Sequence, residues 1–158
     1  MDTTAYDDDI AAWAAEQVAL LRSGQLSRID AEHIAQEIED LANRDRHELS
    51  NRFAILLAHL LKWQRQPERR GSSWQKTIRN QRKQIAGLLK ATPSLKHLMA
   101  DPAWQEKVWM DARDKAVHEA GFDYDLLPAE WPWPVEQVQS PDFLPSGGCN
   151  AFLPDAGE

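Results

Sequence analysis

Apolar residues recur at helical spacing along most of the chain, whereas the alternating pattern of a strand appears nowhere. In the first periodic segment the apolar positions are Ile10, Trp13, Ala14, Leu20 and Leu21. Three aspartates at 7–9 precede them, where the helix dipole favours negative charge, and Gly24 offers a stop. The pattern predicts a helix over residues 7–24.

The longest periodic segment begins at Asp30, which can cap a helix, and contains neither proline nor glycine as far as Gln66. Its apolar positions are Ile34, Ile38, Leu41, Leu49, Phe53, Leu56, Leu60 and Trp63. Residues 53–61 are apolar on nearly all sides, which is typical of a helix surrounded by others. We predict one helix over 30–66, with a kink or a division into two helices near residues 43–46 as alternatives.

A third helix is expected over residues 72–92. Pro67 ends the long helix, Gly71 allows the turn, and Ser72 with Gln75 fits a capping box. The apolar positions of the third helix are Trp74, Ile78, Ile85, Leu88 and Leu89.

A fourth helix is expected over residues 101–120. Asp101 and Pro102 suit its N-cap and first turn, and Gly121 closes it. Its predicted buried face consists of Trp104, Val108, Ala112 and Ala116.

The pattern changes after Gly121. The stretch WPWPVEQVQSPDFLP contains prolines that prevent a long helix and large apolar groups that favour burial. Residues 121–145 are therefore predicted to form a strap with one helical turn at 135–140, followed by a loose tail over 146–158. Residues 1–158 are expected to form a single all-α domain, an antiparallel helical bundle with a long central helix and a Pro/Trp-rich C-terminal strap.

Composition indicates a folded protein, since hydrophobic residues make up 42 % of the chain. No segment approaches the length of a membrane span, and the N-terminus lacks signal-peptide features. Cys149 is the only cysteine, which excludes an intrachain disulfide and a multi-cysteine metal site. We expect a bacterial-type cytoplasmic protein with no membrane partner and no cofactor.

Several stretches are similar to a known family. They are YDDDIAAWAAEQVALLRSGQ, EIEDLANRDRHELSNRF, LLAHLLKWQRQPERRGSSWQKTIRNQRKQI, TPSLK and SPDFLP. Together they resemble the bacterial domain-of-unknown-function family twenty-nine over nearly the whole chain. The resemblance implies an all-helical fold and carries over no catalytic residue. WPWPVEQ departs from the mixed aromatic and polar stretch usual in the family, which bears only on the strap.

Positive charge is concentrated in one predicted helix–turn–helix hairpin. The net charge is −7, yet residues 59–83 contain eight bases and one acid. The bases are Lys62, Arg65, Arg69, Arg70, Lys76, Arg79, Arg82 and Lys83. Guanidinium groups beside a helix N-terminus suit an anionic group, so this hairpin is the candidate site for an acidic protein, nucleic acid or another protomer.

The ordinary alternative for these bases is charge pairing within the protein or with a second subunit. Candidate partners are Glu37, Glu39 and Asp40, or Asp111 and Asp114. Trp63 and Trp74 could stack on bases of nucleic acid, but their positions on apolar stripes favour the core.

A carboxylate–histidine set is the second candidate, because helical bundles build metal sites from inward-facing side chains of these types. The set comprises Glu37, Asp40, His59 and Glu119. The spacing Glu-x-x-His of di-metal bundles is absent, so no metal is expected. The sequence therefore favours a non-catalytic interaction module over a helical-bundle enzyme or metal protein.

Overall fold

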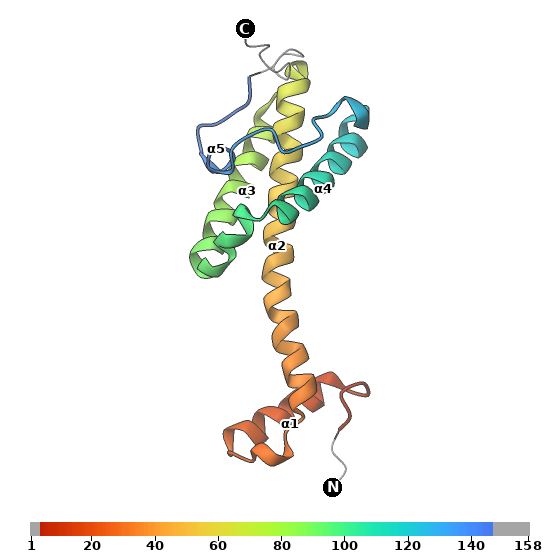
Figure 1. Ribbon diagram of the computed structural model, residues 1–158, viewed down its shortest axis with the longest axis vertical. Helices are drawn as coiled ribbons and strands as arrows, with labels where there is room; N and C mark the ends of the chain where they lie inside the picture. The colour runs from red at the N-terminus through yellow and green to blue at the C-terminus, as the bar shows by residue number, and fades with distance from the viewer. Residues whose placement is uncertain (1–3, 147–158) are drawn as a thin grey trace. The chain divides into compact units, whose positions relative to one another are not determined.

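The computed structural model describes residues 4–146, and within that range every regular element is helical (Figure 1). This confirms the all-α class and the helical bundle. The α-helices are α1 (Ile10–Arg22), α2 (Ala31–Arg65), α3 (Ser72–Ala91), α4 (Pro102–Ala120) and α5 (Val135–Gln139). The 3₁₀ helices are η1 (Leu26–Arg28), η2 (Pro67–Arg69), η3 (Pro93–Ala100) and η4 (Tyr124–Leu126). The predicted tail beyond Ser146 and Cys149 lie outside the described residues.

None of the helices between residues 4 and 146 combines the length and the apolar character that a membrane-spanning helix needs. Internal contacts divide the chain into two compact units, one ending at Arg44 and one beginning at Asp45. The sequence predicts one domain, and α2 contributes residues to both units. Each unit is described by itself.

The N-terminal unit is built from α1, η1 and the first part of α2. Asp9 caps α1 by accepting the backbone N–H groups of Ala11 and Ala12, as the acidic cluster predicts. Asp30 caps α2 by accepting the N–H of His33. Gln17 is buried, and its side-chain oxygen accepts the N–H of Asp30 at 2.7 Å. Gln17, a polar residue on the apolar face of α1, therefore connects α1 to the start of α2.

The predicted apolar stripes are partly wrong in this unit. Ile10 and Leu21 are exposed, although both lie on the expected face of α1. Ile38 and Leu41 of α2 are 62 % and 57 % exposed. The physical reason is that this unit contains too few elements to cover both helices all round, so helical periodicity overstates burial.

The core of the C-terminal unit lies where the second part of α2, α3 and α4 meet. Figure 1 shows α3 returning beside α2, with α4 also alongside. Most residues of the segment 53–61 of α2 are almost completely buried, as the apolar run predicts, whereas Ile55 and His59 are half-buried. The predicted face of α4 is confirmed, and Trp109 joins it.

Local signals explain where most of these helices begin and end. Asp101 caps α4 by accepting the N–H of Ala103, and Gly121 closes α4 with a φ of 71°, which favours glycine. The predicted cap of α3 is wrong: Gly71 occupies the N-cap position, and Ser72 is already helical. The 3₁₀ helix η3 begins at Pro93, in a segment where no periodic signal predicts structure.

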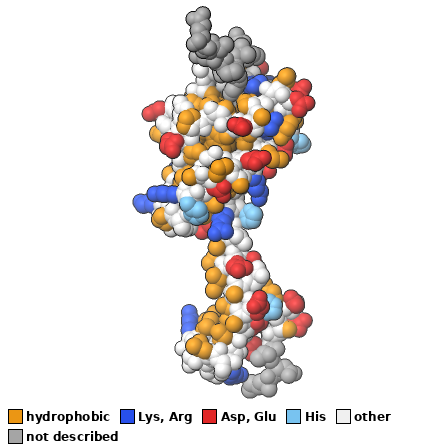
Figure 2. All heavy atoms as spheres, in the orientation of Figure 1, with side chains coloured by type: hydrophobic (Ala, Val, Ile, Leu, Met, Phe, Trp, Pro, Cys, Tyr) orange, Lys and Arg blue, Asp and Glu red, His pale blue; other side chains and the backbone are white. Residues whose placement is uncertain are grey.

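The strap packs against the bundle as the Pro- and Trp-rich stretch predicts. Leu127 and Val138 are buried, and α5 is the predicted helical turn, while the 3₁₀ helix η4 adds a second turn that the sequence did not predict. The indole of Trp109 donates to the carbonyl of Pro128 at 2.8 Å, which fixes the start of the strap on α4. In Figure 2 hydrophobic side chains gather on the visible face of this unit.

Candidate functional site

The basic hairpin consists of the end of α2, the 3₁₀ helix η2 and the first part of α3. Pro67 prevents α2 from continuing, so α2 ends at Arg65 and the chain turns back into α3. The eight bases of this hairpin do not share one environment. Four are engaged by the protein itself, and four are exposed.

Lys62 is buried and forms an ion pair with Glu119 of α4 at 2.5 Å. Its ammonium also lies 5.6 Å from the ring centre of Trp74. The pKa of Glu119 is lowered, chiefly by the hydrogen bond from Lys62, and partial burial opposes this shift. Pairing across the bundle therefore occurs, but the acid is Glu119 and not Asp111 or Asp114. Lys62 is a bundle contact and is not open to a ligand.

Arg65 and Arg70 are half-buried beside the turn. Arg70 donates to the carbonyl of Trp63 at 2.6 Å, and its guanidinium lies 5.2 Å from the Trp63 ring centre. Arg65 also interacts with the rest of the protein. Trp63 is buried, as the stripe predicts, and Arg70 covers it.

Arg82 holds the strap on α3. It is only 8 % exposed, and its guanidinium donates to the carbonyls of Val138, Pro141 and Phe143 at 2.9, 3.4 and 2.6 Å. Burial lowers the pKa of Arg82, although the charge of Asp142 opposes the shift. The expectation that Arg82 faces an anion outside the protein is therefore wrong, because backbone carbonyls of the strap take its place.

The exposed bases of the hairpin are Arg69, Lys76, Arg79 and Lys83. Among residues 4–146, no ion pair engages any of them. The last three lie on one face of α3, which Lys90 extends by two further turns. We call Lys76, Arg79, Lys83 and Lys90 the α3 stripe. At 1.5 Å per residue the stripe extends over about 21 Å, and α3 contains no acidic residue.

A small hollow of about 160 Å³ adjoins the stripe. Arg79 borders it together with Ile78, Pro141 and Leu144, so a cation lies beside apolar walls. Arg82 forms part of the same hollow and fixes the strap residues that complete it. This arrangement places a small recess with both polar and apolar walls next to an exposed positive charge.

The carboxylate–histidine set does not assemble. Glu37 and Asp40 belong to the N-terminal unit, where Glu37 accepts a hydrogen bond from Tyr6 and Asp40 accepts one from Gln36. In the C-terminal unit, His59 bonds to the carbonyl of Ile55 at 2.9 Å. Its pKa is lowered, chiefly by burial. Between residues 4 and 146, no three His, Cys, Asp or Glu side chains are grouped to hold a metal ion.

The profile of a protein family described as Domain of unknown function DUF29 matches residues 5–144. The chain belongs to the DUF29 family. The match spans both units and the whole basic hairpin, which confirms the resemblance found in the sequence. No curated protein and no solved structure matches the chain. Because the DUF29 description states no activity, only the geometry of the chain bears on its function.

A second polar cluster of this DUF29 protein lies in the N-terminal unit. Tyr6 donates to Glu37, and its ring stacks on His33 with centres 4.2 Å apart. His33 bonds to Asp30 at 2.7 Å, and the indole of Trp13 donates to the same carboxylate at 3.1 Å. The sequence places His33 and Glu37 one turn apart, but Tyr6 precedes the first helix, where no periodicity marks it.

The electrostatics of this cluster are set by its hydrogen bonds. The bond to Glu37 raises the pKa of Tyr6 from 10.0 to about 12, with partial burial and the charge of Glu37 adding to the shift. The bond from His33 lowers the pKa of Asp30. The cluster connects the residues before α1 to α2.

The raised pKa of Tyr6 leads to a testable prediction for the alkaline titration of the protein. Because folding raises its pKa, Tyr6 stabilises the N-terminal unit below pH 10 and loses that contribution as the pH rises through about 12. The protein contains two tyrosines, so tyrosinate absorbance can follow them individually in a Tyr6→Phe variant. We expect the variant to lack the late part of the alkaline titration. If the late part persists in Tyr6→Phe, the assignment to Tyr6 is wrong.

Proposed function

We propose that this DUF29 protein is a non-catalytic interaction module that binds an acidic segment of a partner protein along the α3 stripe. The observation that carries the proposal is the exposure of Lys76, Arg79, Lys83 and Lys90 on a helix with no acidic residue. In the described part of the chain no ion pair occupies these cations. Internal pairing, the ordinary explanation of a basic run, accounts for Lys62 and leaves the stripe available.

A protein segment suits this surface better than nucleic acid does. Bases of single strands bind by stacking on exposed aromatic rings, but Trp63 is buried beneath Arg70 and Trp74 is half-buried beside Lys62. The net charge of −7 also repels a polyanion at long range. A short acidic segment experiences the local field of the stripe more than the charge of the whole molecule, because salt screens distant charges.

The hollow beside Arg79 indicates which side chain the partner segment needs in addition to its carboxylates. Its walls include Ile78, Pro141 and Leu144, which favour an apolar side chain. The partner segment is therefore an acidic helix or strand that carries an apolar residue between its carboxylates. Such a segment could come from another protein or from a second copy of this chain, whose residues 1–50 contain twelve acids and four bases.

Calorimetric titration with designed peptides tests the proposal. The first peptide is a helix of about 15 residues, matched to the length of the stripe, with glutamates at every third or fourth position and one central leucine. The second has glutamine in place of every glutamate. We expect only the glutamate peptide to bind, and its affinity to fall between about 50 mM and about 200 mM salt.

Three results would decide between the sources and the classes of partner. Equal binding of both peptides, or tighter binding of a single-stranded oligonucleotide than of the glutamate peptide, would contradict the proposal. A monomer that becomes a dimer with rising protein concentration, and returns to monomer when the glutamate peptide is added, would identify a second copy as the partner. A protein that stays monomeric at all concentrations would leave another protein as the source.

A further inference from the structure

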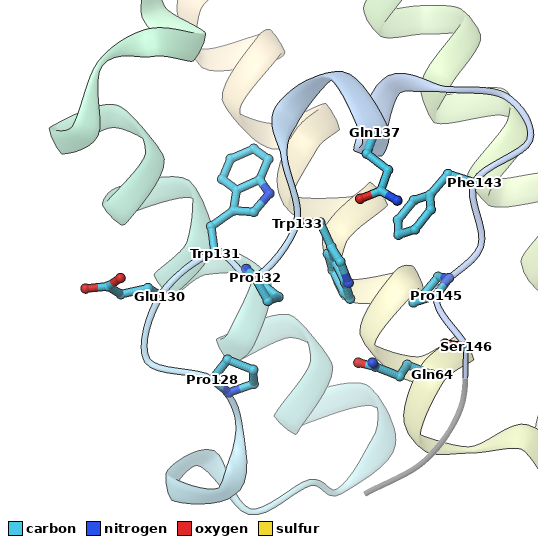
Figure 3. A pocket seen from close by; sticks show the side chains of 10 residues that line it. All are labelled: Gln64, Pro128, Glu130, Trp131, Pro132, Trp133, Gln137, Phe143, Pro145 and Ser146. Carbon is cyan, nitrogen blue, oxygen red and sulfur yellow. The ribbon is translucent and has the colours of Figure 1, made fainter. Parts of the chain in front are cut away.

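The strap borders an open cavity of about 600 Å³ over the end of α2, on a part of the unit distinct from the α3 stripe (Figure 3). Its walls combine polar and apolar groups: Trp133 and Phe143 supply aromatic rings, Pro128, Pro132 and Pro145 supply three pyrrolidine rings, and Gln64 and Gln137 supply amides. We call it the strap cavity. Its volume is within the range of sites for small molecules, roughly 300–1,000 Å³.

Among the described residues that line the strap cavity, two buried polar groups have no hydrogen-bond partner: the side-chain oxygen of Gln64 and the indole N–H of Trp131. Gln64 of α2 is only 4 % exposed, and its side-chain oxygen forms no hydrogen bond within the described residues. Figure 3 shows the Gln64 amide directed from α2 toward the space beneath the prolines. An unpaired buried acceptor destabilises a protein, so we expect the side-chain oxygen of Gln64 to accept a hydrogen bond from a donor outside the chain.

The walls define which donor can reach Gln64. Three of the lining residues are prolines, which have no backbone N–H, and the donors of Trp131, Gln137 and Ser146, which also line the cavity, form no bond to the amide oxygen. Among the described residues, the one charged group lining the cavity is Glu130, which is exposed. A charged ligand would lose its hydration without gaining a deep counter-ion, which favours a neutral ligand.

We propose that the strap cavity binds a small, neutral, planar organic molecule that carries an N–H donor. Its ring contacts Trp133 and Phe143, whose centres are 6.1 Å apart at 65°, and its N–H donates to the side-chain oxygen of Gln64. This ligand differs in charge and chemistry from the acidic partner of the α3 stripe, and the inference does not rest on that function.

Indole and 1-methylindole form the matched pair of probes, since they share a bicyclic ring and only indole has an N–H. Binding is followed by nuclear magnetic resonance of the tryptophan indole N–H groups in the full chain. We expect both probes to shift the signal of Trp133 and to leave that of Trp13, in the N-terminal unit, unchanged. Indole should bind about fivefold more tightly, the value of one neutral hydrogen bond.

Two substitutions separate the Gln64 contact from general hydrophobic binding. Gln64→Leu keeps a similar volume and should abolish the preference for indole while retaining weak binding of both probes. Gln84→Leu removes an exposed amide of α3 that does not line the cavity, and the preference should remain. The proposal is overturned if neither probe shifts Trp133, if the native protein binds both equally, or if Gln64→Leu keeps the preference. If Gln64→Leu does not fold, the comparison of indole with 1-methylindole on the native protein still tests the proposal.

Discussion

Replacing Arg82 by alanine is expected to lower the free energy of unfolding by about 3–5 kcal/mol. The substitution removes three charge-assisted hydrogen bonds and leaves the carbonyls of Val138, Pro141 and Phe143 without their donor. It also removes the packing of a side chain that is more than nine-tenths buried. Urea unfolding measures the loss, and hydrogen exchange of residues 135–145 shows whether the strap opens first.

Neighbouring substitutions control for the loss of a positive charge. Arg79→Ala removes an exposed guanidinium one turn away and is expected to change stability by less than about 0.5 kcal/mol. Arg82→Lys keeps the charge but replaces the planar fork by a single ammonium, so it should fall between native and Arg82→Ala. Equal stabilities of Arg82→Ala and Arg79→Ala would show that the bonds to the strap contribute nothing.

Features that depend on neighbouring residues could be predicted from the sequence. Asp9, Asp30 and Asp101 cap their helices because the aspartate oxygen bonds to N–H groups two or three residues later, and Gly121 adopts the left-handed conformation that ends a helix. Helical periodicity likewise identified most of the core of the C-terminal unit. The eight-residue 3₁₀ helix η3 could not be predicted, because such runs are uncommon and have no apolar repeat of their own.

The sequence could predict only in part which bases of the hairpin are engaged by the protein and which are exposed. Arg82 lies four residues after Ile78 and three before Ile85, so its position on the buried face of α3 could have been read from spacing. The hydrogen-bond partners of Arg82 could not be predicted, because the strap carbonyls lie more than fifty residues away in the chain. The same applies to Lys62, which lies in an apolar run and meets its acid only through the packing of α4.

The strap cavity illustrates another limit of prediction. The prolines and tryptophans of residues 128–145 indicate packing, but not the path of a chain without a regular repeat. Gln64 follows Trp63 in α2 and gives no sign in the sequence that its oxygen is left unpaired. Only the path of the strap over α2 reveals the open cavity between them.

Charge reversal on the α3 stripe is expected to have the largest effect on binding. The double substitution Arg79→Glu with Lys83→Glu replaces two attractive contacts with the acidic peptide by two repulsive ones. We expect a loss of about 2 kcal/mol at low salt, or about thirtyfold in Kd, and a smaller loss as salt rises. Folding should be retained, because both side chains are exposed and form no ion pair with the described residues.

The most direct measurement compares this variant with one of equal net charge. Lys96→Glu with Lys107→Glu changes two exposed lysines outside the stripe and shifts the total charge by the same amount. Titration of both folded variants with the glutamate peptide at about 50 mM salt separates a local site from the overall field. The account predicts that the stripe variant loses binding about thirtyfold while the Lys96/Lys107 variant stays within about threefold of native. Equal losses in the two variants, or native affinity in the stripe variant, would contradict a binding site on α3.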